Sequence, residues 1–323
     1  MNSDGGVDPF FNPGANGLVD CLAMQADGKI LVGGAFTMLG GKARTCLGRL
    51  NPDGSLDDSF APDANGPVHT LVVQADGKIL VGGTFTFLGG QSRTNLSRLN
   101  PNGTLDVSFD SWANDSVTTL AVQPDGKVLA GGNFSSLSGQ PRVRIGRLGT
   151  ASAALESLAL NTNSTVVTWS RSGAGPEVEQ VTFELSTDGA NYTALGNGAR
   201  LNGGWQFSGL SSSPGFSFYV RSRGRAIGGE YAGSSSYIES IGQFYRGAPA
   251  LTGAALLHKG VFQFTFDGTG ATNFTVLATT NLSLPASNWN ALGPPMSLGD
   301  GAYQVSDPGA TNLTRRFYRV RFP

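Results

Sequence analysis

One segment occurs three times in the first half of this sequence. It reads QADGKILVGG from Gln25, is unchanged from Gln74, and returns as QPDGKVLAGG from Gln123. The aspartates of the three copies, Asp27, Asp76 and Asp125, are 49 residues apart. Each copy is followed by an Arg-Leu pair, at 49–50, 98–99 and 147–148. A period of this length predicts three copies of one supersecondary unit, each packed against its neighbour.

Each unit is predicted to hold four short antiparallel strands. In the second unit these are 68–74, 78–85, 95–99 and 104–109. An Asp-Gly turn joins the first two strands, because glycine accepts the positive φ that a tight hairpin requires. The glycine pair inside the second strand indicates a bulge or a close approach of another backbone. Four strands in a unit of this size are typical of a propeller blade.

The repeated pattern resembles a known family. The pattern VxxLxVQxDGKILVGGxF, followed by RLNxxGxLDxSF, is similar to the delta-60 repeat and covers residues 5–149. That resemblance implies a propeller-forming repeat of large bacterial extracellular or surface proteins. It implies a scaffold, with no catalytic residues to transfer.

The third unit lacks its fourth strand, and an equivalent segment lies at the other end of the domain. Val7, Phe10 and Phe11 align, one period earlier, with Leu56, Ser59 and Phe60. We expect residues 7–11 to complete the sheet of the third unit, either in the same chain or in a neighbouring copy. Three blades are too few for an ordinary propeller. The alternatives are a dimeric ring of six, an open filament built by strand exchange, and a compact β-trefoil.

Two further modules follow the repeats, at 150–246 and 247–323. Alternating runs at 165–170, 181–186 and 216–221, separated by glycine turns, predict a β-sandwich. This segment loosely resembles a fibronectin type III-like module, with Trp169 and Trp205 expected in its core. The last segment resembles a small C-terminal β module of secreted bacterial proteins. The fold class predicted for the whole chain is all-β.

Composition and charge exclude several classes of protein. Glycine supplies 47 of the 323 residues and charged residues only 14%, which excludes a coiled coil and a highly charged disordered chain. The formal net charge of -1 gives no electrostatic footprint for nucleic acid. There is no apolar run long enough for a transmembrane helix and no signal-peptide pattern in this chain. With the family resemblance, we expect a secreted or cell-surface protein. Cys21 and Cys46 are expected to be buried free thiols, with a disulfide as the alternative.

Catalytic chemistry finds little support in the sequence. Histidine occurs twice, at His69 and His258, in different modules, and no nucleophile elbow, phosphate loop or dinucleotide-binding motif occurs. The aspartates of the repeats fall in predicted turns without the spacing of a calcium loop. We therefore expect no enzyme activity, no cofactor and no metal.

A row of arginines is the candidate ligand-binding site. Arg44, Arg93 and Arg142 each follow a glycine-rich loop, beside which Met38 and Phe87 vary. They predict a rim whose guanidinium groups could grip an acidic group. The alternative is that these arginines bond neighbouring carbonyls, while Arg49 and Arg98 pair with Asp57 and Asp106. The expected function is a non-enzymatic scaffold that binds a glycan or protein through this rim. The alternative function is a self-assembling subunit of a surface or extracellular fibre, with residues 7–11 exchanged between copies.

Overall fold

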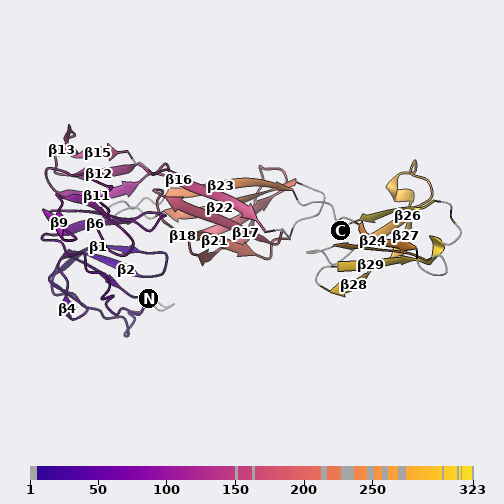
Figure 1. Cartoon of the computed structure of the whole chain (residues 1–323), viewed down its shortest axis with the longest axis horizontal. Coiled ribbons are helices and arrows are strands. Elements are labelled where there is room, and N and C mark those ends of the chain that lie inside the picture. The colour runs from indigo at the N-terminus through magenta and orange to yellow at the C-terminus, as the bar shows by residue number, and fades with distance from the viewer. Residues whose placement is uncertain are drawn as a thin grey trace.

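The computed structural model describes most of the chain. The described residues are 6–149, 152–161, 164–211, 217–226, 236–245, 251–256, 261–267, 274–299, 302–310, 313 and 315–321. They form small antiparallel β-sheets, so the all-β prediction is confirmed. Figure 1 shows the three repeats at one end, followed by two separate groups of strands. Within the described residues, no helix is long and apolar enough to cross a membrane.

Each repeat forms a three-stranded antiparallel sheet and a separate small hairpin. The sheets have the strand orders β1-β2-β5, β6-β7-β10 and β11-β12-β15. Their strands are β1 (Leu18–Met24), β2 (Ile30–Ala35), β5 (Leu47–Leu50), β6 (Val68–Val73), β7 (Ile79–Gly83), β10 (Leu96–Leu99), β11 (Val117–Val122), β12 (Val128–Gly132) and β15 (Ile145–Leu148). The hairpins are β3 (Met38–Leu39) with β4 (Lys42–Ala43), β8 (Phe87–Leu88) with β9 (Gln91–Ser92), and β13 (Ser136–Leu137) with β14 (Gln140–Pro141).

The expected fourth strand is reduced to a single bridge. In the second repeat this bridge joins Leu99 to Leu105, and the chain then turns. The turn is set by Asp106, whose Oδ1 accepts hydrogen bonds from the backbone N–H and the hydroxyl of Ser108, at 3.0 and 2.6 Å. An aspartate that bonds the chain two residues ahead favours a turn over an extended ladder.

The three sheets stack in chain order, because glycine lets neighbouring repeats approach closely. A Cβ placed on Gly33 of β2 would lie 2.8 Å from Cγ1 of Val68 and 3.2 Å from Cδ1 of Leu71. The equivalent Gly82 of β7 meets Val117 and Leu120 in the same way. The bulge or close backbone approach predicted at the glycine pair is confirmed within the sheet: a Cβ on Gly34 would lie 2.1 Å from the carbonyl oxygen of Leu18, and a β-bulge lies between Val19 and Cys21 of the paired strand. One apolar cluster fills the space between the first and second sheets, and a second cluster fills that between the second and third.

The segment after the repeats forms a two-sheet sandwich. One sheet has the order β16-β17-β21-β20 and the other β19-β18-β22-β23. The strands are β16 (Ala154–Leu160), β17 (Val166–Gly173), β18 (Val178–Ser186), β19 (Thr193–Asn197), β20 (Ala199–Leu201), β21 (Gly204–Ser208), β22 (Ser217–Ala226) and β23 (Ser236–Tyr245). Trp169 is fully buried between the sheets and Trp205 packs against the same cluster, so both tryptophans are core residues as expected.

The last segment also forms two sheets, with an aromatic core. Their orders are β24-β25-β29-β28 and β27-β26-β30. The strands are β24 (Leu251–Leu256), β25 (Phe262–Asp267), β26 (Thr275–Thr279), β27 (Asn290–Gly293), β28 (Met296–Gly299), β29 (Ala302–Asp307) and β30 (Phe317–Arg321), with short 3-10 turns η2 (Ala286–Asn288) and η3 (Pro308–Ala310). Phe264, Phe266 and Phe274 are buried at its centre.

A hydrogen-bonded junction joins the second repeat to the first sandwich. The turn between β6 and β7 lies against the loop between β17 and β18. The N–H of Ala75 donates to the carbonyl of Gly175 at 2.7 Å, and Nε2 of Gln74 donates to the carbonyl of Ala174 at 2.9 Å. From the sandwich side, the N–H of Glu177 donates to the carbonyl of Val73 at 3.1 Å. The sandwich is therefore fixed to one turn of the repeat stack.

Candidate functional site

The three small hairpins form a rim along the side of the repeat stack that faces away from the sandwich modules (Figure 1). One asparagine per repeat holds each hairpin in place. Asn65, for example, donates its N–H to the carbonyl of Phe87 at 3.2 Å, and its Oδ1 accepts from the N–H groups of Thr86 and Phe87, both at 2.9 Å. Asn16 and Asn114 make the equivalent contacts. The rim is therefore a repeated, fixed framework.

The three rim arginines are held by the backbone beside them. Nη1 of Arg44, Arg93 and Arg142 donates to the carbonyl of the preceding residue, at 2.7, 2.8 and 2.7 Å. Arg44 also lies 3.4 Å from a carboxylate oxygen of Asp58. This is the carbonyl-bonding alternative that the sequence raised. Their binding of a ligand stays a prediction.

Apolar side chains stand exposed on the same rim. Met38 and Phe87 are 43% and 44% exposed on the first strands of their hairpins. Trp112, which sequence reasoning missed, is 40% exposed beside the third hairpin, where its carbonyl accepts the N–H of Ser138. The neighbouring Ala113 donates to the carbonyl of Thr94 at 3.3 Å, so Trp112 lies where the second and third repeats meet.

A buried ion-pair clasp lies in each of the first two repeats, away from the hairpins. Nε of Arg49 is 2.9 Å from Oδ2 of Asp57, and Nζ of Lys29 is 2.8 Å from the same oxygen. Arg98, Lys78 and Asp106 repeat this arrangement at 2.8 and 2.9 Å. The predicted pairing of these arginines with the two aspartates is thus confirmed. The Nη1 of Arg49 also donates to the carbonyl of Pro101 at 2.7 Å, which ties the first repeat to the second.

The clasp keeps its aspartates ionised. Burial disfavours the charged carboxylate of Asp57, but the hydrogen bonds from Lys29 and Ser59 and the charge of Arg49 outweigh it. They hold the pKa of Asp57 well below its usual range, and the equivalent partners do the same for the pKa of Asp106. Their role is structural support of the repeat.

The N-terminal segment lies on the first repeat. Residues 7–11 form no strand in this chain, and Val7 and Phe10 are exposed. Phe11 packs on the outer cluster of the first repeat, close to Gly54. Completion of the third sheet within one chain is therefore wrong, because the first repeat already holds the segment. That residues 7–11 complete the third sheet of a neighbouring copy of the chain stays a prediction.

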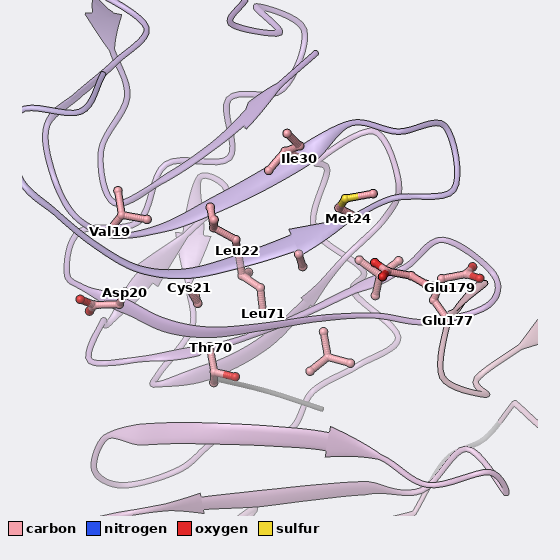
Figure 2. Close-up of a pocket in the computed structure, with 13 residues that line it drawn as sticks. Val19, Asp20, Cys21, Leu22, Met24, Ile30, Thr70, Leu71, Glu177 and Glu179 are labelled. Atoms are coloured by element: carbon pink, nitrogen blue, oxygen red, sulfur yellow. The ribbon is translucent and has the colours of Figure 1, made fainter. Parts of the chain in front are cut away.

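A hollow of about 570 Å³ lies beside β1 and β6 (Figure 2). Its walls are mostly apolar and include Leu22 and Leu71, and two acids from the sandwich, Glu177 and Glu179, lie at the end near Met24. Burial raises the pKa of Glu179, with the charge of Arg225 opposing and that of Glu177 adding to the rise. None of the rim residues lines this hollow.

One histidine lies in a polar chain between the first two repeats. Nδ1 of His69 is 2.9 Å from Oδ2 of Asp20, and its Nε2 is 3.1 Å from the hydroxyl of Thr84. The contact joins β1 to β6 as a structural bridge. His258 lies outside the described residues.

Cysteine and metal chemistry are limited in the described part of the chain. Cys21 and Cys46 are both buried and not joined in a disulfide, as expected, and burial raises the pKa of Cys46. No group of three or more metal-ligating side chains is found among the residues that the structure describes.

The family comparison agrees with the repeat geometry. Residues 25–60, 74–109 and 123–150 match a family model described as a domain of unknown function (DUF5122) beta-propeller. The protein carries propeller-like repeats. The three matches begin 49 residues apart, like the stacked sheets, and the third stops where that repeat lacks the segment equivalent to 104–109. No curated protein matches the chain.

Proposed function

We propose that this protein is a non-enzymatic extracellular or cell-surface scaffold that binds a glycan or protein ligand through the rim. The observation that carries this proposal is the row of equivalent hairpins, each fixed by an asparagine and all directed away from the sandwich modules (Figure 1). A rigid frame lowers the entropy lost when a ligand binds. The extracellular location is supported by the family resemblance alone.

Of the two ligand classes, the rim favours a glycan. Its exposed apolar groups, Met38, Phe87 and Trp112, come from three different repeats and are flanked in the sequence by polar residues and arginines. A protein interface usually has a contiguous, desolvated centre with a polar rim. Isolated aromatic faces beside hydrogen-bonding groups suit sugar rings, whose faces are apolar and whose edges are polar.

Binding to a microarray of soluble oligosaccharides tests this proposal. We expect the whole chain to retain at least one glycan class, and Trp112→Ala and Phe87→Ala to weaken that binding by more than about tenfold, the loss of one good aromatic contact. Tyr237→Ala is the matched control, since Tyr237 is an exposed aromatic on the sandwich. An empty array, or binding unchanged in both rim variants with unaltered melting temperatures, would contradict the proposal.

The sandwich modules are proposed to act as spacers that carry the rim outward. The pairing orders β16-β17-β21-β20 and β19-β18-β22-β23 support a fibronectin type III-like module at 150–246, because they follow the ABED and CFG grouping of that architecture. The likeness of 247–323 to C-terminal modules of secreted bacterial proteins stays a proposal. The alternative function, a self-assembling fibre subunit, is favoured by the two uncovered ends of the repeat stack.

A further inference from the structure

Neighbouring repeats of this chain meet through two different surfaces, one from each repeat. One surface is apolar: Val68, Leu71 and Val73 of β6 and Ile79 of β7 project toward the first repeat. The other is the surface around Gly33, Leu31 and Leu47 that receives them. The second and third repeats meet through the equivalent residues. Such a contact is heterologous, so every stack of these repeats ends in two unlike faces.

The first repeat exposes the projecting surface. We call Val19, Leu22 and Met24 of β1 and Ile30 of β2 the head face; they lie one period before Val68, Leu71, Val73 and Ile79. Leu22 is 64% exposed, whereas its equivalent Leu71 is 5% exposed. The four head-face residues also line the hollow described above (Figure 2). This face is apolar and is covered by no repeat of this chain.

The third repeat exposes the receiving surface. We call Leu129 and Gly131 of β12 and Ile145 of β15 the tail face, equivalent to Leu80, Gly82 and Leu96. Ile145 is 67% exposed, whereas Leu96 is fully buried. A Cβ on Gly131 would meet only Thr119 and Arg144 of its own repeat, with no neighbour from another repeat. In Figure 1 the head and tail faces belong to opposite ends of the stack.

The charged residues at the two ends of the stack are complementary in the same way as the apolar faces. The third repeat has the cations of the buried clasp, Lys127 and Arg147, but its Lys127 pairs with Asp125 of its own turn. Among the described residues, no carboxylate forms an ion pair with the exposed Arg147. Asp8 lies 49 residues before Asp57, and its Oδ1 accepts the N–H of Phe10 at 2.9 Å, as Asp57 accepts that of Ser59 at 3.0 Å. Asp8 is thus the carboxylate that the third repeat lacks.

The ring of Phe11 is placed to complete this clasp. Inside the chain, Phe60 lies against Gly103 of the following repeat, and the guanidinium of Arg49 lies 4.3 Å over the centre of the same ring. Phe11 lies against Gly54 in the same manner. The first repeat therefore holds residues 8–11 in the position in which a preceding repeat would receive them.

We propose that the head face docks on the tail face of a second copy of this chain, with Asp8 in the clasp of Lys127 and Arg147 and Phe11 beneath that arginine. The internal contact between repeats is the template for every part of this interface. When two copies dock in this way, each head face covers the tail face of the other copy. The pair then contains six repeats, which is within the usual size of a propeller ring. The interface does not involve the rim, so this proposal is independent of the ligand.

Two variants used together test the direction of the contact. Leu22→Arg disables the head face and Ile145→Arg disables the tail face; both positions are exposed in the single chain, so folding is retained. Light scattering after size exclusion should give at least two copies for the wild type and 33.5 kDa for each variant alone. An equimolar mixture of the variants retains one intact head and one intact tail, and should give a complex of two copies. Ile241→Arg, on the exposed face of β23, is the matched control and should assemble like the wild type.

The outcomes separate the alternatives. A wild type that stays at one copy at high protein concentration overturns the proposal. So does a mixture that fails to associate while the wild type assembles, because assembly would then use a different surface. Asp8→Arg and Arg147→Asp should each weaken association by more than about tenfold, as expected for a charge left without its partner in a contact. An equimolar mixture of these two variants should restore the association. If it does not, Asp8 and Arg147 do not pair across the interface.

Discussion

At the scale of single residues, the repeats depend on a few polar groups buried beside apolar strands. Asp106 is one of these groups: one of its oxygens bonds Ser108 and the other lies between Lys78 and Arg98. Arg98 also lies 4.9 Å over the ring of Phe109. Removing the carboxylate therefore leaves two cations near an apolar cluster without a counter-charge.

Asp106→Asn should lower the free energy of unfolding by about 3 kcal/mol at pH 7, the range for breaking a buried ion pair. The folded-state pKa of Asp106 is depressed, so its stabilisation is present above the unfolded value near 4 and is lost as the pH falls through the folded pKa. The gap between wild type and variant should thus be constant from about pH 5 to 8 and narrow in acid. Urea unfolding at several pH values measures this.

Asp58→Asn is the control for that measurement. Asp58 pairs with Lys42 at the surface, so its loss should cost less than about 1 kcal/mol. Equal losses for the two variants would show that the buried clasp contributes no more than a surface pair.

At the scale of elements, the stacking of sheets depends on glycines in the middle strands. Gly82 of β7 is contacted by Val117 and Leu120 of the next repeat, and by Thr70 of its own sheet. Gly131 of β12 has the equivalent neighbour in its own sheet, Thr119, and none from another repeat. The two positions therefore differ by the contact between repeats.

Gly82→Ala should destabilise the protein by about 1–3 kcal/mol, as overpacking of a tight contact does. Gly131→Ala should cost clearly less, because only the methyl of Thr119 has to move. Urea unfolding at a protein concentration low enough for single chains gives both values. A larger loss at Gly131 would contradict the stacking described here.

The elements also show which parts of the fold the sequence predicts and which parts it does not. The period and the first three strands of each unit follow from the local pattern and were predicted. The fourth strand was wrong because the Leu-Asp-x-Ser motif forms a side-chain turn, a signal that the sequence does carry. Loops are predicted where the rim hairpins lie, although Gly40-Gly41 is a two-residue hairpin signature. Trp112 was missed because its equivalents in the other repeats, Gly14 and Asp63, are not aromatic.

At the scale of the whole molecule, the junction between the second repeat and the first sandwich sets the direction in which the sandwich modules extend from the repeats. It could not be predicted, because it joins residues such as Gln74 and Ala174, which no local pattern relates. Its shortest backbone hydrogen bond runs from the N–H of Ala75 to the carbonyl of Gly175, at 2.7 Å. Proline removes that donor, and the equivalent turn of the third repeat already contains Pro124.

Ala75→Pro should therefore loosen the sandwich from the repeats while it leaves the turn intact. Small-angle X-ray scattering should show a broader distribution of dimensions, with the melting temperature of the repeats unchanged. Ala26→Pro, at the same position of the first repeat, is the control, since no hydrogen bond to the sandwich involves that turn in the described structure. Scattering identical to that of the wild type in both variants would show that the remaining contacts fix the junction alone.

The placement of Phe60 on Gly103 has a consequence for the length of such chains. Phe60, at the end of the first repeat, packs on the turn of the second repeat, and Phe11 packs on Gly54 of the first repeat in the same way. An insertion or deletion of 49 residues between two repeats would thus join two surfaces that already fit. Any other length would break the register. The chain can grow or shrink only in whole units, and each added unit would extend the rim by one hairpin.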